Sequence, residues 1–127
     1  MKVTNPKSYP KEDDEAKIFA KYLSDMQAYK QIVCYSHIPN ETSIKNIGYY
    51  MKQKAMGKCA GVPDYIVVTK KKVLFIELKR QKNERGTTTS CVAPDQKLWI
   101  SALNDANCPS QICYGSGQAI NFVQSML

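Results

Sequence analysis

Residues 61–80 read GVPDYIVVTKKKVLFIELKR, two apolar runs on either side of a lysine cluster. Short apolar runs of this kind predict a pair of buried β-strands joined at the lysines. One carboxylate lies at the outer end of each run, Asp64 in the first and Glu77 in the second. The stretch therefore predicts two negative charges at one end of a buried strand pair.

The loop between the strands decides how the two carboxylates are placed. A loop of two or of four residues centred on 70–71 gives one pairing, in which Ile66 opposes Phe75 and Asp64 opposes Glu77. Directly opposed side chains share a face of the sheet, with Cβ atoms roughly 4.5–5.5 Å apart. An odd-numbered loop would break this register and separate the acids. With an even loop, we expect the two carboxylates to lie side by side.

Two interpretations of this acid pair are open. Lys79 alternates onto the same face as Glu77, so it could bridge the acids in a structural ion network. Alternatively, the pair binds a cation or has a raised pKa, because like charges directly opposed destabilise a sheet and both faces of the hairpin are covered. One or two carboxylates, with waters and a substrate phosphate, are what Mg²⁺ typically uses.

Length and composition indicate a globular protein with one core. The chain has 127 residues, 43% of them hydrophobic and 23% charged, and we expect an irregular lead-in over 1–11 and a single domain over 12–127. No run approaches the ~18 apolar residues of a membrane span, and the N-terminus lacks the apolar core of a secretory signal. Five cysteines without a CxxC pair argue against a disulfide framework. These features favour a cytoplasmic protein without a membrane partner.

Positive charge is concentrated in the middle of the chain. The formal net charge is +7, and residues 45–85 hold eleven lysines and arginines against three acids. Such a segment would attract a phosphate backbone, although a solvated basic face explains the charge equally well. The candidate nucleic-acid contacts are Lys45, Lys52, Lys54, Lys58, Arg80, Lys82 and Arg85. Tyr49 and Tyr50 lie among these lysines and are candidates for DNA contact, whereas Trp99 and Tyr22 are expected in the core.

A helical pattern begins at Glu12 and places an acid at the head of its buried face. The apolar residues that recur at helical spacing are Phe19, Tyr22, Leu23 and Met26. Glu15 lies four residues before Phe19 and therefore on the same side of the helix. A carboxylate is thus expected at the start of a stripe that packs into the core.

The remaining elements complete an α/β pattern. Before the hairpin, we expect a strand within 31–40 and a helix that is capped by Thr42 or Ser43 and carries the apolar stripe Ile44, Ile47 and Met51. After the hairpin, we expect a polar and mobile loop over 81–95 and a helix from Asp95 with Gln96 and Trp99 on one side. A strand over 111–115 and a final helix over 116–127 follow. Together with the hairpin, these elements predict a mixed β-sheet with helices on its faces.

Several short motifs resemble one group of nucleases. The residues PD at 63–64, followed by ELK at 77–79 on the next strand, resemble the PD-(D/E)xK nuclease signature. Their surroundings are similar to a VRR-NUC domain of the small, stand-alone phage type. The motifs that carry this likeness are HIPNE at 37–41, MGKCAGVPD at 56–64, FIELK at 75–79, and Gln96 with Trp99 on the following helix. The resemblance runs in order from about Glu15 to the C-terminus.

The resemblance implies a restriction-endonuclease-like core, a central mixed β-sheet flanked by α-helices, and metal-dependent hydrolysis of DNA phosphodiester bonds. Carried over by position, Asp64 and Glu77 would bind Mg²⁺, for which Mn²⁺ can substitute. The backbone carbonyl of Leu78 would be a further ligand. Lys79 would orient the attacking water or help to deprotonate it.

The resemblance also assigns residues at the border of the site. Glu15 matches the N-terminal acid of the family and would complete the metal site or hold a metal-bound water. Gln96 matches the glutamine that borders the site. Glu41 stands where similar sequences often have glycine, and it competes with Glu15 for the role of the extra acid. His37, the only histidine, is favoured for a packing or turn role over one in the site.

Substrate and partners follow from the same resemblance. No segment resembles a base-reading module, so we expect selectivity for DNA shape, such as a branched or Holliday-junction-like form, rather than for sequence. Stand-alone family members suggest a homodimer, which would present two sites, and a phage-encoded protein would act in the host cytoplasm. Two alternatives remain: a non-catalytic nucleic-acid-binding module with the same basic surface, and an interaction domain whose basic face is merely solvated.

Overall fold

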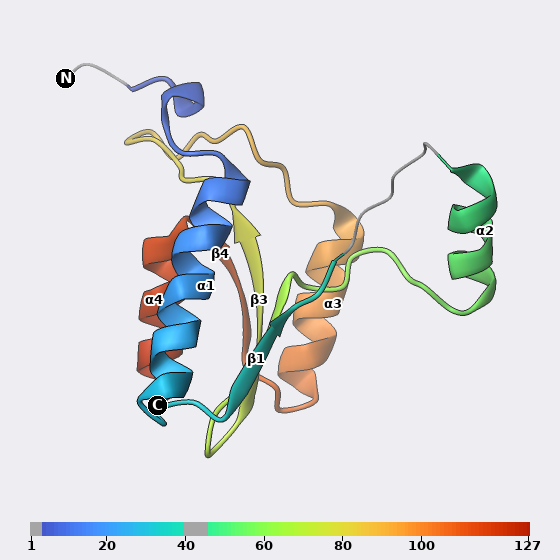
Figure 1. The fold of residues 1–127 in the computed structure, drawn as a ribbon. Helices are drawn as coiled ribbons and strands as arrows, with labels where there is room; N and C mark the ends of the chain where they lie inside the picture. Colours follow the sequence, from blue (N-terminus) through green and yellow to red (C-terminus); the bar gives the residue numbers. More distant parts are fainter. Residues whose placement is uncertain (1–3, 40–45) are drawn as a thin grey trace.

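The computed structural model describes residues 4–39 and 46–127 (Figure 1). In chain order the elements are the 3₁₀ helix η1 (Pro6–Ser8), α1 (Glu12–Ala28), β1 (Cys34–His37), α2 (Ile47–Ala55), β2 (Tyr65–Val68), β3 (Val73–Lys79), α3 (Pro94–Asp105), β4 (Ser110–Tyr114) and α4 (Ser116–Ser125). Each strand and each α-helix lies where the sequence pattern predicts one. Within these described residues, no helix has the length and apolar character needed to cross a membrane.

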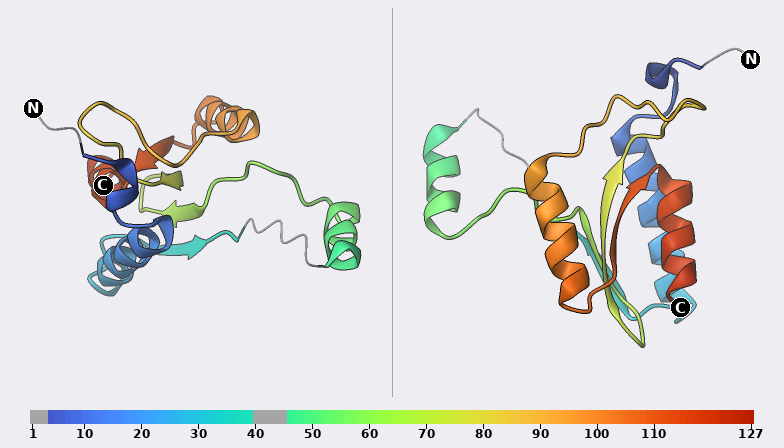
Figure 2. Two further views of the ribbon diagram at one scale, coloured as in Figure 1. Left: turned by 90° about the horizontal axis from the view of Figure 1, so that it is seen from above. Right: turned by 180° about the vertical axis from the view of Figure 1, so that it is seen from behind.

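The four strands form one mixed sheet in the order β1-β2-β3-β4. The first three strands pair antiparallel, and β3 pairs parallel with β4. Helices α1 and α4 pack against each other on one face, and α3 covers the other (Figure 2). The predicted α/β fold with helices on both faces of a mixed sheet is confirmed. Its two inner strands are β2 and β3, and β3 carries side chains that are buried on both faces.

The predicted register of the hairpin is confirmed. Ile66 pairs with Phe75 and Val68 with Val73. A four-residue loop closes the pair, because the amide of Thr69 donates to the Lys72 carbonyl at 2.8 Å. The Thr69 hydroxyl also accepts hydrogen bonds from the loop amides. Since the loop is even-numbered, the residues at the outer ends of both strands project to the same face.

One hydrophobic core joins the sheet to α1 and α4. Its buried apolar residues are Phe19, Leu23, Ile32, Tyr65, Val67, Leu74, Ile76, Leu78, Cys113, Ala119, Phe122 and Val123. The ring of Phe19 meets Tyr65 edge-on, with centroids 5.0 Å apart, a geometry that aromatic pairs prefer. The even-numbered residues of β3 face this core, so Glu77 and Lys79 face the side covered by α3.

Helix α2 differs from its prediction. The residues predicted to cap it, Thr42 and Ser43, lie outside the described residues, and Asn46 is the cap, accepting a hydrogen bond from the Tyr49 amide at 3.0 Å. The apolar stripe does not enter the core, because Ile47 and Met51 are 68% and 57% exposed. Instead, α2 stands apart from the sheet (Figures 1 and 2).

The described part of the lead-in, residues 4–11, and the 81–93 segment contain no helix or strand apart from η1, and hydrogen bonds tie the two segments together. The Arg80 guanidinium donates to the carbonyls of Lys7, Tyr9 and Pro10 at 2.6–2.9 Å and to the Thr89 hydroxyl at 3.1 Å. Arg80 was a candidate DNA contact. Because these bonds use four of its five N–H donors, its guanidinium anchors the N-terminal segment instead.

Gly61, in the GVPD motif, allows the chain to pass closely against the start of α3. Its φ is +92°, and a Cβ at this position would lie 2.6 Å from the carbonyl carbon of Asp95. Gly61→Ala is therefore expected to destabilise the protein by about 2–4 kcal/mol, through left-handed strain and overpacking. Chemical denaturation would measure this change.

Gly57 provides the matched control for this substitution. Its φ of +98° is similar, but a Cβ there would meet no atom within 4 Å. Gly57→Ala should therefore cost only the backbone strain, about 1–2 kcal/mol. Equal losses of stability in the two variants would contradict the proposed contact between Gly61 and α3.

Candidate active site

Asp64 is fixed at the end of the hairpin by bonds to two neighbouring strands. One carboxylate oxygen, Oδ2, accepts a hydrogen bond from the Leu78 amide at 2.8 Å. The Asp64 carbonyl accepts another from the Ile38 amide at 2.6 Å, at the end of β1. The side chain is therefore held beside β3 next to Glu77, as the register predicts.

Glu77 has one oxygen with partners and one without. Its Oε1 accepts a hydrogen bond from Gln96 Nε2 at 2.8 Å and lies 3.5 Å from Lys79 Nζ. Its Oε2 is buried and has no hydrogen-bond partner among the described residues. A buried polar atom without a partner is costly and rare in folded proteins. The ion network that we considered from the sequence accounts for Oε1 but not for Oε2.

The two carboxylates affect each other's ionisation. Burial, and then the negative charge of Asp64, raise the pKa of Glu77 to about 7, although the Lys79 ammonium opposes this shift. Burial also raises the pKa of Asp64, while the bond from the Leu78 amide lowers it. A nearby cation would relieve this cost, because it favours the charged form of both groups.

Gln96 is oriented by the first turn of α3. Its side-chain oxygen accepts a hydrogen bond from the Ala93 amide at 2.9 Å, which turns its NH₂ group toward Glu77. The residue that the sequence places at the border of the site therefore contacts the acid pair directly. Its contact fixes Oε1 of Glu77, while the buried Oε2 has no hydrogen-bond partner among the described residues.

Glu15 does not contact the acid pair. It is buried, with 1% of its surface exposed. Its Oε1 accepts from Gln81 Nε2 at 2.8 Å, and its Oε2 accepts from the Ser116 amide at the start of α4. This side chain links α1 to α4 on the face of the sheet opposite α3. The prediction that Glu15 heads the buried face of α1 is confirmed, but its two oxygens accept hydrogen bonds from Gln81 and Ser116 rather than meeting the acid pair.

Glu12, one turn earlier, lines a cavity with Asp64 and also accepts a hydrogen bond from the Ser90 hydroxyl at 3.2 Å. Its negative charge contributes to the raised pKa of Asp64 and of Glu77. The cavity, of about 100 Å³, is also lined by Leu78. The sequence signal was present but ambiguous, since Glu12 lies seven residues before Phe19 and so also precedes the buried stripe.

His37, the last residue of β1, has the packing role that the sequence favours and also borders the site. It lines the same small cavity as Asp64, and its ring centroid is 5.1 Å from that of Tyr65. Its charge also lowers the pKa of Asp64, as the weakest of several influences. Glu41, the competing candidate for the extra acid, lies outside the described residues.

The predicted basic contacts do not form one cluster. Lys54 and Lys58 line a cavity that also contains Asp64, and Lys52 lies in the last turn of α2. Lys82 instead lies over the Tyr114 ring, 3.9 Å from its centroid, and Arg85 belongs to the 81–93 segment. Lys45 is outside the described residues. Positive charge therefore approaches the acid pair mainly from the α2 side.

The site offers few ligands for a metal ion. No group of three or more histidine, cysteine, aspartate or glutamate side chains arranged for a metal occurs in the described part of the chain. Two carboxylates and a main-chain carbonyl are a ligand set for a hard cation that keeps several waters. They are not the closed set of four nitrogen or sulfur ligands that a structural zinc site needs.

Comparison with known proteins identifies the family. No curated protein matches the chain. A solved structure described as a VRR_NUC domain protein superposes with a TM-score of 0.66 at 21% sequence identity, covering 91% of this chain and 87% of that one. At this identity the likeness shows the fold alone. The family model of the VRR-NUC domain matches residues 9–117. The chain therefore belongs to the VRR-NUC domain family.

Proposed function

We propose that this protein is a metal-dependent DNA endonuclease that selects its substrate by shape. Membership of the VRR-NUC family implies a nuclease-type domain. The observation that carries the finer proposal is the buried, unpartnered Oε2 of Glu77 beside the Asp64 carboxylate. This oxygen is a ligand position that neither Lys79 nor Gln96 uses.

The residues present fit Mg²⁺, or Mn²⁺ in its place. Asp64 and Glu77 would hold the ion together with the Leu78 carbonyl, and Glu12 would hold one of its waters from the small cavity. When bound, such an ion lowers the pKa of an attacking water and neutralises charge on the phosphate. The raised pKa of both carboxylates is consistent with a pair that is built for a cation.

The chain's own residues supply position and charge. Lys79 is buried, with 6% of its surface exposed, and its ammonium is held 3.5 Å from Glu77. A fixed positive charge at this place would stabilise the negative charge that develops on the phosphate. Gln96 holds Glu77 in place, and the Leu78 amide holds Asp64. Both carboxylates are therefore oriented before substrate or metal arrives.

We also propose that the protein acts as a homodimer on branched DNA. The apolar side chains of Ile47 and Met51 are exposed on α2, which stands apart from the sheet (Figure 1). A nine-residue helix is only marginally stable alone, so a second copy is a reasonable partner for this surface. Sedimentation of the pure protein would give its mass in solution.

The test of the proposed function is a cleavage panel. Four-way junction, flap, duplex and single-stranded DNA would be incubated with the protein with and without Mg²⁺ or Mn²⁺. We expect cleavage only with metal, and faster on the branched forms. Salt-dependent binding without turnover in either metal would support the non-catalytic binding module instead. No binding at moderate salt would leave only an interaction domain.

The two acids at the start of α1 should separate into different roles. Glu12→Gln is expected to lower metal-dependent cleavage about 10- to 100-fold with little change in stability, because Glu12 is exposed and acts through the metal site. Glu15→Gln should reduce stability by about 1–3 kcal/mol, since one of its two buried acceptors becomes a donor. Cleavage rates and thermal denaturation of both variants would measure this. Loss of activity without loss of stability in Glu15→Gln would reverse the assignment.

A further inference from the structure

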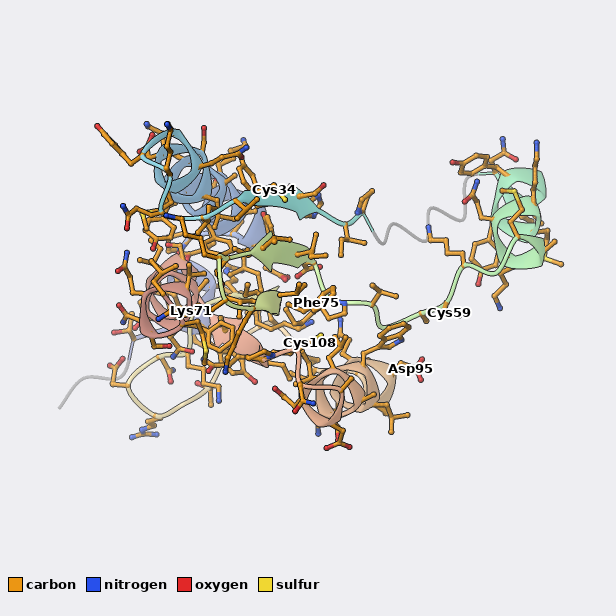
Figure 3. The ribbon with its side chains drawn as sticks, turned by 90° about the horizontal axis from the view of Figure 1, so that it is seen from below. Cys34, Cys59, Lys71, Phe75, Asp95 and Cys108 are labelled. Carbon is orange, nitrogen blue, oxygen red and sulfur yellow. The ribbon has the colours of Figure 1, made fainter. Side chains whose placement is uncertain are left out.

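Two adjacent cavities lie between Asp64 and α2. The smaller, of about 250 Å³, contains Asp64 and Gln96. The larger, of about 560 Å³, lies between α2 and Trp99 of α3, and its volume is within the ~300–1,000 Å³ range of small-molecule sites. The residues that line both are Tyr50, Lys58, Cys59 and Val62. Figure 3 shows Cys59 on the segment that returns from α2 to the sheet, on the same side of the molecule as Asp95.

The larger cavity has an aromatic and basic lining. Tyr49, Tyr50 and Trp99 contribute rings, and Lys58 contributes a positive charge. No carboxylate lines it among the described residues. The Trp99 ring is fixed in place, because its Nε1 donates to the Ala60 carbonyl at 3.0 Å. A site whose described lining combines rings with a lysine and holds no carboxylate is suited to an uncharged, flat group attached to a phosphate.

We infer that the larger cavity holds an unpaired nucleobase of the DNA strand whose backbone lies at the acid pair. The inference rests on the proposed function and adds a substrate requirement to it. Bases that are not stacked in a duplex are typically held by stacking on aromatic side chains, with lysines following the backbone. Lys54, which lies 5.4 Å from the Tyr50 ring centroid and lines the smaller cavity, is placed to contact the phosphate between the two cavities.

The arrangement of α2 favours a nucleotide over a second copy of the chain in this cavity. The helix residues that line the two cavities are Tyr49, Tyr50, Gln53 and Lys54. The exposed apolar residues Ile47 and Met51 line neither cavity. The apolar surface suited to a protein partner is therefore separate from the aromatic surface suited to a base.

Binding measured in EDTA tests the inference without any cleavage. The probes are a duplex with one unpaired nucleotide, carrying 2-aminopurine at that position, and the same duplex fully paired. We expect the wild type to bind the unpaired form about 5- to 150-fold more tightly, the range that one stacked base provides. The 2-aminopurine fluorescence should decrease on binding because the base stacks on a ring.

Variants of α2 provide the controls. Tyr50→Ala should lose the preference for the unpaired nucleotide, Tyr50→Phe should keep it because the ring remains, and Ile47→Ala should keep it because Ile47 lies outside the cavity. In the unaltered protein, the labelling rate of the Cys59 thiol, read by peptide mass mapping, should fall with the unpaired DNA and not with the paired form.

Three outcomes would overturn the inference. The first is equal affinity of the wild type for paired and unpaired DNA. The second is a Tyr50→Ala variant that weakens both equally, which indicates a general contact. The third is a Tyr50→Ala variant that sediments as a smaller species than the wild type and also loses the preference for unpaired DNA. That result would mean that the cavity is a contact between subunits. Since no cleavage is read, none of these results depends on whether the protein is a nuclease.

Discussion

Asp64→Asn is expected to lower metal-dependent DNA cleavage by about 10²–10⁴-fold while leaving the protein folded. The asparagine oxygen can still accept the hydrogen bond that the Leu78 amide donates at 2.8 Å, so the junction between the strands is kept. The substitution removes the negative charge beside Glu77, and a divalent cation at this site needs that charge. Initial cleavage rates on the branched substrate would measure the effect, and the far-ultraviolet circular dichroism spectrum would check the fold.

Lys79→Ala should reduce activity over a similar range for a different reason. It removes the positive charge that lies 3.5 Å from Glu77, while both carboxylates stay. The variant should still fold, because Glu77, whose pKa is already raised to about 7, can bind a proton in place of the ion pair. Its metal affinity should be retained, which separates it from Asp64→Asn.

A matched control is available on the surface of α1. Asp25 pairs with Lys21 at 3.2 Å, and both side chains are largely exposed. Asp25→Asn makes the same chemical change as Asp64→Asn and should leave cleavage unchanged. Full activity of both Asp64→Asn and Lys79→Ala would remove the assignment of this site.

The position of the acid pair could be predicted from sequence because strand geometry is simple. Side chains alternate with a period of two, so an even loop fixes the register of Ile66 against Phe75 and brings Asp64 to Glu77. The residues that surround the acid pair were harder to predict. Four consecutive acids, at 12–15, begin α1, and a helical period of 3.6 residues puts both Glu12 and Glu15 near the buried stripe. The tertiary structure distinguishes them: Glu15 accepts a hydrogen bond from the first residue of α4, whereas Glu12 lines a cavity with Asp64.

The surfaces were the least predictable part of the structure. Helical periodicity shows that residues such as Ile47 and Met51 share one side of a helix, but it does not identify what covers that side. The sequence also does not show which lysines and arginines bind a partner and which bind the protein's own main chain. Arg80 and Lys54 were equivalent candidates in the sequence, yet Arg80 binds three main-chain carbonyls, while Lys54 lies beside the cavities. These differences depend on tertiary contacts that no local pattern contains.

Glu77→Gln is expected to abolish cleavage and yet to stabilise the metal-free protein above neutral pH. Ionised Glu77 is unfavourable in the folded state, since burial and Asp64 raise its pKa from 4.5 to about 7. Between these values the folded protein holds a proton that the unfolded chain has released, so the stability of the wild type falls as the pH rises through this window. The loss is complete above pH 7, and glutamine, which does not ionise, avoids it.

The pH dependence of the stability difference is the measurement that isolates this effect. The free energy of unfolding of Glu77→Gln minus that of the wild type should increase by about 1–2 kcal/mol between pH 5 and pH 8 in EDTA. This is less than the full pKa shift corresponds to, because solvent screens part of the interaction between the charges. Any constant cost of the substitution, such as the loss of the partner of Lys79, cancels in this comparison. Adding Mg²⁺ at pH 8 should then stabilise the wild type and not the variant, because only the wild type keeps both carboxylates for the ion. A stability difference that does not change with pH, together with no response of the wild type to Mg²⁺, would mean that Glu77 is an ordinary partner of Lys79 and that its free oxygen has no ligand to bind.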